Sequence, residues 1–117
     1  MTSELLGESY FKKAKTRLKI LSLLIDEGDY SDVVREAQEI VELALKGILR
    51  KIGVEPPKPQ KDTERIAEIS KWLRKEREFA FYGDVDLIPS EEYKRADAER
   101  AKKDAEFVVA WVRSGFV

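Results

Sequence analysis

The sequence predicts an all-α protein, an antiparallel up-and-down bundle of four to five helices. Apolar residues recur at intervals of three and four along four segments, as they do on the buried face of a helix. No run alternates apolar and polar residues as a half-buried strand would. With 117 residues and 43% hydrophobic content, the chain is long enough to bury a core. We therefore expect a single domain over residues 1–117.

The first two helices are expected at about residues 3–27 and 31–52. Gly28 ends the first one as a C-terminal cap, and Asp29 or Ser31 caps the second. The predicted inward residues of the first are Leu6, Tyr10, Ala14, Leu18, Leu21, Leu24 and Ile25. Those of the second are Val34, Ala37, Ile40, Val41, Ala44, Leu45, Ile48, Leu49 and Ile52. Gly47 lies in this helix, where Gly costs up to ~1 kcal/mol relative to Ala, and so predicts a close helix–helix approach, for example at a dimer axis.

The last two helices follow two connecting segments. The segment VEPPKPQKD (54–62) is expected to be extended because its prolines cannot donate helical hydrogen bonds. The third helix then begins near Thr63 and continues to about Phe81. After the loop YGDVDLIPSEE (82–92), the fourth begins between residues 90 and 97 and ends near Ser114, before Gly115. The predicted inward residues of these two helices are Ile66, Ile69, Trp72, Leu73, Ala98, Ala101, Ala105, Val108, Val109 and Val112.

The composition excludes several classes of site. The chain has no Cys and no His, which removes disulfides, Ser-His-Asp hydrolysis and His-ligated zinc. We expect no metal and no cofactor. No apolar run approaches the length of a membrane span, and MTSELLGESYF lacks the order of a secretion signal, so a cytoplasmic protein is expected. The absence of Asn and the 38% of charged residues suggest a thermophilic source.

The charges are unevenly distributed although the net charge is only −1. A basic run covers residues 12–19, an acidic segment follows at 26–42, and residues 46–75 carry a surplus of bases. Such runs are typical of a solvated surface. They are also compatible with a face that binds phosphate groups, or with one that docks on another protein. The near-neutral net charge gives no general attraction for nucleic acid.

Two stretches of the sequence resemble the HEPN domain family. They are GDYSDVVREAQEIVELALKGILRKIGVEPPK (28–58) and LRKEREFAFYGDVDLIPSEEYKRADAERAKKDAEFVVAWV (73–112), and the resemblance covers about residues 5–113. It implies an antiparallel helical bundle that usually forms a homodimer. Many members of this family pair with a small nucleotidyltransferase in toxin–antitoxin-like systems. Others are metal-independent endoribonucleases.

The resemblance also implies where a catalytic site would lie. Ribonuclease members of the family carry an Arg, then a polar residue, then a His a few residues further along. Arg77 and Glu78 match the first part, and the His position falls at Tyr82, Gly83 or Asp84. None of these is His. Arg77, Tyr82 and Asp84 are therefore candidates for a degenerate catalytic site.

A basic and aromatic cluster near this position predicts a binding site. The candidate binding residues are Lys46, Arg74, Lys75, Glu78 and Phe81. Cations beside aromatic rings suit phosphate contacts with base stacking. Four of these five residues also have a structural interpretation. Phe81, like Phe79, can pack the bundle end, and Arg74–Glu78 and Glu42–Lys46 have the spacing of helix-surface ion pairs.

Two further sets of residues are candidates for a binding site. Tyr93 lies close in sequence to the aromatic cluster and is counted with it as a stacking candidate. Arg35, Gln38 and Glu39, early in the second helix, either face a pocket or form a solvated polar face.

The sequence therefore predicts a homodimeric HEPN-like binding module that recognises a nucleotide or RNA, or partners a small nucleotidyltransferase, without cleaving RNA. The first alternative is a metal-independent endoribonuclease that uses Arg77 with Tyr82 or Asp84. Because a free Tyr has a pKa near about 10 and a free Asp near about 4, both are weak general bases at neutral pH. The second alternative is a protein–protein scaffold.

Overall fold

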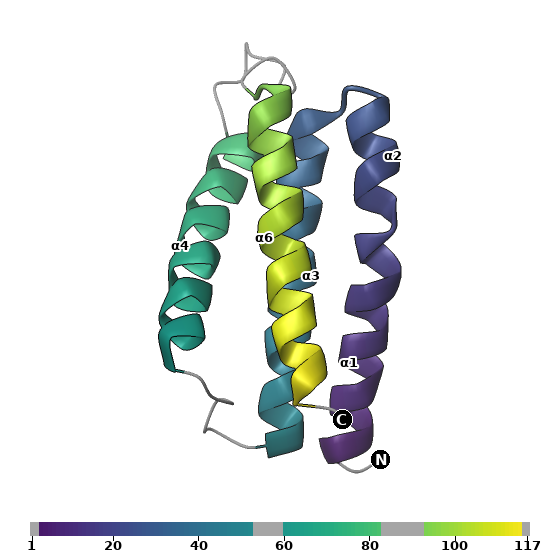
Figure 1. Cartoon of the computed structure of the whole chain (residues 1–117). Coiled ribbons are helices and arrows are strands. Elements are labelled where there is room, and N and C mark those ends of the chain that lie inside the picture. Colours follow the sequence, from purple (N-terminus) through teal and green to yellow (C-terminus); the bar gives the residue numbers. More distant parts are fainter. Residues whose placement is uncertain (1–2, 53–59, 83–92, 116–117) are drawn as a thin grey trace.

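The computed structural model describes residues 3–52, 60–82 and 93–115, with side chains for 5–50, 62–75 and 93–115. These residues form five helices (Figure 1): α1 (Ser3–Leu18), α2 (Ile20–Asp26), α3 (Tyr30–Ile52), α4 (Gln60–Tyr82) and α6 (Arg95–Ser114). No helix in these ranges is both long enough and apolar enough to cross a membrane.

The helices form an up-and-down bundle, which confirms the predicted fold class. α1 and α2 run end to end along one side, and α3, α4 and α6 then alternate in direction (Figure 1). α3 contacts every other helix, whereas α4 contacts α3 and α6 but neither α1 nor α2 within the described residues. α3 and α6 therefore lie between the α1–α2 pair and α4 (Figure 1).

The first predicted helix is divided into α1 and α2, so the expectation of one helix over 3–27 is wrong at Lys19. The Thr16 hydroxyl donates a hydrogen bond to the Lys12 carbonyl at 3.1 Å. The Lys19 N–H donates a hydrogen bond to the Thr16 carbonyl, three residues back, at 3.2 Å. A hydroxyl that binds the carbonyl four residues back competes with the helical hydrogen bonds and bends the helix.

The turn between α2 and α3 is formed as predicted. Gly28 has φ +77°, a left-handed conformation that Gly adopts without a steric cost. The N–H groups of Gly28 and Asp29 bond to the carbonyls of Ile25 and Leu24 at 3.0 and 2.9 Å, the pattern of a Schellman motif. Asp29 precedes α3 and its carbonyl accepts from the Val33 N–H at 3.1 Å, so Asp29, rather than Ser31, occupies the capping position.

The other helix ends differ only partly from the prediction. α4 begins at Gln60 instead of Thr63, so the last three residues of the segment predicted to be extended are helical. The run of prolines ends at Pro59, and Asp62 supplies a negative charge to the first turn of α4. α6 begins as predicted, where the Lys94 N–H donates to Asp97 Oδ2 at 2.9 Å. The rest of the two connecting segments, 53–59 and 83–92, lies outside the described residues.

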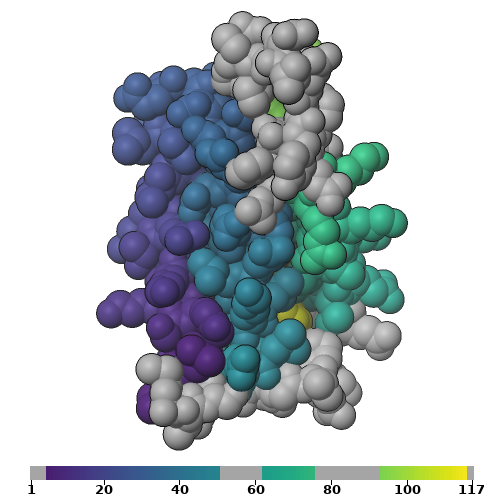
Figure 2. Space-filling model, turned by 180° about the vertical axis from the view of Figure 1, so that it is seen from behind, coloured from purple at the N-terminus to yellow at the C-terminus, as the bar shows by residue number. Residues whose placement is uncertain are grey.

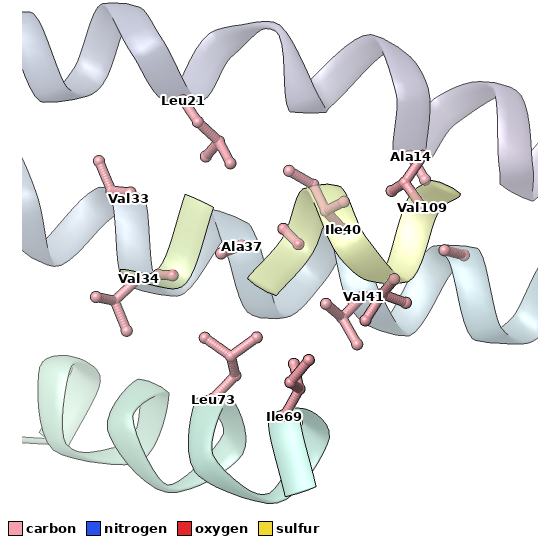
Figure 3. Packing of buried hydrophobic residues seen from close by; sticks show 14 of the residues in the cluster. Ala14, Leu21, Val33, Val34, Ala37, Ile40, Val41, Ile69, Leu73 and Val109 are labelled. Atoms are coloured by element: carbon pink, nitrogen blue, oxygen red, sulfur yellow. The ribbon is translucent and has the colours of Figure 1, made fainter. Parts of the chain in front are cut away.

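The buried core follows α3 (Figure 3). Val33 is turned toward α2, whereas Val34 and Val41 are turned toward α4. Leu21 from α2 and Leu73 from α4 reach α3 from opposite sides, and both are fully buried. The fully buried large side chains are Leu21, Val33, Val34, Ile40, Val41, Ile48, Leu73, Val108 and Val112.

Gly47 marks a close approach of helices, as predicted, but the neighbour belongs to the same chain. A Cβ at Gly47 would lie 2.9 Å from the Gly7 carbonyl oxygen and 3.2 Å from the Phe11 nitrogen, both in α1. This contact explains Gly47 without a dimer axis.

Some individual burial predictions are wrong. Leu49 was expected in the apolar stripe of α3, but its side chain is 48% exposed. Phe11 and Trp111 are buried although the periodic pattern did not include them. Tyr93 is buried in the core, which removes it from the predicted stacking cluster because its ring is not accessible to a ligand.

Candidate functional site

A groove separates α3 from α4 along part of their length. It has a volume of about 270 Å³. Its lining residues are Gln38, Val41, Glu42, Leu45, Lys46, Leu49, Ser70, Leu73 and Arg74. α3 lies between α1 and α4 on the face shown in Figure 2, and this groove follows its border with α4.

The groove exists because α4 contacts α3 through a narrow apolar stripe. Ile66, Ile69 and Leu73 are spaced by three and four residues, and all three are buried. Ser70 falls between them in sequence and brings a hydroxyl to the seam, where a larger apolar side chain would fill the space. The contact between α3 and α4 is therefore apolar at Leu73 and polar at Ser70.

Two polar side chains lie deep in the groove. Gln38 on α3 is only 3% exposed. The Ser70 Oγ on α4 is buried and makes no hydrogen bond within the described part of the chain. A buried hydroxyl without a partner costs free energy, typically about 1–3 kcal/mol, which a ligand could recover by bonding to it. This observation favours an occupant with polar atoms.

The rim of the groove carries charge. Lys46 on α3 and Arg74 on α4 are exposed cations, and Glu42 is the acid among the lining residues. A second hollow lies along α4 and is lined by Ala67, Ser70, Lys71, Arg74 and Lys75. The two hollows share Ser70 and Arg74, so the positive charge continues from the groove across α4.

The structure brings together part of the predicted binding site. Lys46 and Arg74 are distant in sequence but line one groove. Lys75 lines the adjoining hollow with Arg74. These three of the predicted binding residues therefore gather on one border of the bundle.

The binding roles of Lys46, Arg74 and Lys75 stay predictions, and the side chains of the remaining predicted residues cannot be placed. Arg77, Glu78, Phe81 and Tyr82 belong to the last turns of α4, but their side chains lie outside the described residues. Asp84 lies outside them entirely. The catalytic assignments and the Arg74–Glu78 ion pair therefore stay predictions.

The sequence did not clearly predict two residues of the groove, Gln38 and Ser70. Gln38 had two interpretations, and its burial beside the groove supports the pocket rather than the solvated face. Arg35 lies on the outer side of α3, paired with Asp32, and Glu39 faces Arg17. Ser70 was missed because a Ser within an amphipathic helix carries no signal of its own. Its spacing from Leu73 and Arg74 could have indicated it once the groove was known.

Part of the charge pattern is explained within the chain. Arg17, from the basic run of α1, lies 3.7 Å from Glu36 and 3.9 Å from Glu39 of α3. The Lys15 ammonium lies 5.0 Å from the centre of the Phe11 ring. These contacts favour a structural role for this portion of the basic run over a phosphate-binding one.

The seam between α4 and α6 is built from cations and aromatic rings. The Arg100 guanidinium lies 3.8 Å from the centre of the Trp72 ring, and that of Arg65 lies 3.9 Å from the centre of the Phe107 ring. Arg100 also lies 3.8 Å from Asp104. Burial raises the pKa of the Asp104 carboxyl, and the nearby guanidinium groups, first that of Arg100, oppose this shift.

The described residues contain no group of three His, Cys, Asp or Glu side chains that could hold a metal ion. The chemistry available at the groove is that of two cations, the Glu42 carboxylate, an amide, a hydroxyl and an apolar floor. Such a set can bind an anion that also has an apolar part.

Comparison with known proteins finds one similarity to a family, over part of the chain. The model of the HEPN domain matches residues 8–61, from α1 to the beginning of α4. The match includes the α3 side of the groove and ends before Arg74 and Arg77. No curated protein and no solved structure matches the chain. The all-helical up-and-down arrangement of the described residues agrees with this match, so residues 8–61, slightly less than half of the chain, are similar to the HEPN domain.

Proposed function

We propose that this chain is a HEPN-domain binding module that forms a homodimer and recognises a nucleotide or RNA without cleaving it. A small nucleotidyltransferase is the protein partner that fits this role. The observation that carries the proposal is the groove between α3 and α4, where Lys46 and Arg74 stand above buried polar groups.

The proposed lack of cleavage follows from the side chains available. Cleavage of RNA without a metal requires a base for the 2′-hydroxyl, an acid for the leaving oxygen, and cations for the phosphate charge. Arg77 could supply a cation, but the sequence contains no His to act as base and acid near neutral pH. Tyr and Asp are poorly matched to that task.

The proposed binding role is supported by the charge and polarity of the groove. Guanidinium and ammonium groups bind phosphate oxygens through charge-assisted hydrogen bonds. Lys46 and Arg74 hold two such groups on opposite borders of one groove. The apolar floor, which includes Leu73 and Val41, offers a surface for a nucleobase.

The first test is incubation of the purified protein with RNA, with and without a chelator, beside the variant Arg77→Ala. We expect intact RNA from both proteins. Cleavage by the wild type that survives chelation and is lost in a folded Arg77→Ala variant would establish the ribonuclease alternative instead. Helicity measured by circular dichroism verifies that the variant is folded.

Two further measurements test the partners. Light scattering during gel filtration should give twice the chain mass of 13.5 kDa for a homodimer. Copurification with a small nucleotidyltransferase encoded beside this chain should give a stable complex. A monomer that binds neither RNA, nor nucleotide, nor such a partner would contradict the proposal.

A further inference from the structure

The outer face of α1 and α2 carries cations that the described part of the chain does not pair. The α1–α2 pair forms one border of the bundle (Figure 1), and residues 9–25 contain five bases and no acid. Two of these bases contact acids of α3 or an aromatic ring of α1. The other three, Lys12, Lys13 and Lys19, are exposed and form no ion pair within the described ranges.

Six exposed residues of this border repeat at alternating spacings of four and three. They are Leu5, Ser9, Lys12, Thr16, Lys19 and Leu23. This spacing places them along one stripe of a helix, and it is the spacing at which two helices pack side by side in a coiled coil. The backbone of Lys19, at the junction of α1 and α2, has φ −67° and ψ −21°, which are helical values, so the stripe continues across the junction.

The stripe is apolar at its two ends and basic in between. Leu5 and Leu23, at the ends, are 54% and 59% exposed. Lys12 and Lys19 lie between them and point their charges at the same partner. The serine and the threonine of the stripe have short side chains, which allow another backbone to come close. At 1.5 Å per residue, the stripe is about 27 Å long, enough for about five turns of a second helix.

This chemistry selects among the possible occupants. A second copy of α1 would bring lysines against lysines, and three acids of α3 are already paired within their own chain. The aliphatic ends of the stripe offer RNA neither a stacking ring nor a hydrogen-bond donor. A helix that lies on a membrane keeps its lysines on the polar face, opposite its apolar one. Here two lysines lie on the stripe itself.

We propose that the outer face of α1 and α2 binds an acidic amphipathic helix of another protein. The carboxylates of that helix face Lys12 and Lys19, and apolar side chains at its two ends meet Leu5 and Leu23. This inference concerns a face other than the groove and goes beyond the proposed function. Because exposed ion pairs are individually weak, the complex is weak and salt-sensitive, and the charges determine which helix is accepted.

The test is a titration of the full chain with a helical peptide of three heptads, about 21 residues, followed by amide chemical shifts. The peptide has Leu at the outer positions of its seam and Glu at the central ones. We expect shifts at Lys12, Thr16, Lys19 and Leu23, and none at Lys103 on α6. Raising the salt from about 0.05 to about 0.5 M should weaken binding severalfold, because salt screens exposed charges. The same peptide with Lys in place of Glu should cause no shift.

Charge reversal separates binding from a merely structural role of the lysines. The double variant Lys12→Glu, Lys19→Glu should raise the Kd of the acidic peptide at least about tenfold. It should also bind the Lys peptide, which the wild type rejects. Lys103→Glu reverses an exposed lysine on α6 and should leave the Kd of the acidic peptide unchanged. Helicity measured by circular dichroism verifies that the variants are folded.

Several outcomes would overturn the inference. One is an acidic peptide that shifts none of these amides, or that binds no more tightly than the Lys peptide. Another is the same set of shifts from vesicles that contain phosphatidylserine, from RNA, or from a higher protein concentration, while the peptide gives none. The occupant is then a lipid surface, a nucleic acid or a second copy. None of these results bears on the groove between α3 and α4, whose lining residues are tested separately.

Discussion

The seam between α1 and α3 and the seam between α3 and α4 are built on different principles. At the first, Gly47 brings two backbones together, so that an added Cβ would lie 2.9 Å from the Gly7 carbonyl. Ala14 on α1 and Ala44 on α3 are also fully buried. At the second, larger side chains such as Leu73 hold the helices apart, and Gln38 and Ser70 lie beside them.

This difference shows where a ligand can be accommodated. Small residues let the backbones of α1 and α3 approach closely at Gly47. The larger and more varied side chains between α3 and α4 leave a groove with polar groups in it. α4 is also held to α6 by charged and aromatic pairs, whose energy is modest when they are exposed. The α1–α3 seam therefore acts as the scaffold, and the α4 border carries the candidate site.

The largest expected effect comes from removing the anchor of α4. Leu73→Ala deletes a fully buried side chain and should lower the free energy of unfolding by about 2–5 kcal/mol. Denaturant unfolding measures this loss. Amide exchange should increase most in α4, since α4 contacts only α3 and α6 among the described helices.

The matched control is Leu49→Ala, because Leu49 borders the same groove but is 48% exposed. Its loss should be well below that of Leu73→Ala, under about 1 kcal/mol. Equal losses from the two variants would show that Leu49 is covered in the protein, for instance by a second copy. Faster exchange in α1 than in α4 of Leu73→Ala would contradict the independence of the two seams.

The second prediction tests the close seam. Gly47→Ala should destabilise the protein by about 1–3 kcal/mol, because the new methyl group meets the Gly7 backbone, which cannot move aside cheaply. The sign is informative, since Ala in place of Gly in an open helix would stabilise it by up to ~1 kcal/mol. Thermal or denaturant unfolding measures the change.

The comparison for Gly47→Ala is Ala110→Gly, at an exposed position of α6. There the loss should come from helix propensity alone, at roughly 1 kcal/mol. If Gly47→Ala instead raised the stability, the backbones of α1 and α3 would have to lie further apart than the structure places them.

Some parts of the fold could be predicted from the sequence and others could not. The spacing of apolar residues along α3 and α6 correctly predicted core positions such as Ile40, Ile48 and Val112, because a helix buried on one face imposes this period. It failed for Leu49, since periodicity does not show where a neighbouring helix diverges. It also failed at Lys19, since the apolar period gives no sign of the hydrogen bond between the Thr16 hydroxyl and the Lys12 carbonyl shortly before the break.

The candidate site was predictable only in part for a related reason. Lys46 and Arg74 could be chosen from charge alone, but only the packing of α4 on α3 brings them to one groove. Ser70 became notable through the absence of a hydrogen-bond partner in the described structure, a property that no sequence pattern expresses. The family resemblance pointed to the Arg77 region, but the side chains there lie outside the described residues, so that assignment stays a prediction.

A third and smaller effect tests how α4 is held to α6. Arg100→Ala removes a guanidinium that lies over the Trp72 ring and beside Asp104, and should cost about 1 kcal/mol. Arg95→Ala is the matched control, because Arg95 makes the same kind of pair with Glu99 at 3.2 Å but lies over no aromatic ring of the described residues. The control should lose much less stability than Arg100→Ala, because an ion pair in full contact with solvent contributes little. Equal losses would mean that the contact with Trp72 contributes nothing measurable.

The smallest expected effect is the pH dependence set by Asp104, whose side chain is 15% exposed. Burial raises the pKa of its carboxyl above the usual 3.8, so the folded state holds this proton more tightly than the unfolded chain. The stabilising contribution is then complete below about pH 3.8 and is lost as the pH rises through the folded pKa.

Asp104→Asn keeps the shape of the side chain and cannot ionise. The stability of the wild type relative to this variant should therefore fall as the pH rises from about 3.8 toward neutrality, by less than about 1 kcal/mol, because solvent and Arg100 compensate much of the charge. Denaturant unfolding at several pH values measures the difference, and Glu106→Gln on the same helix controls for the loss of one negative charge. A difference that rises with pH would mean that the attraction of Arg100 and Arg65 exceeds the effect of burial. The seam between α4 and α6 would then be held by its charges more strongly than the comparison of the two seams implies.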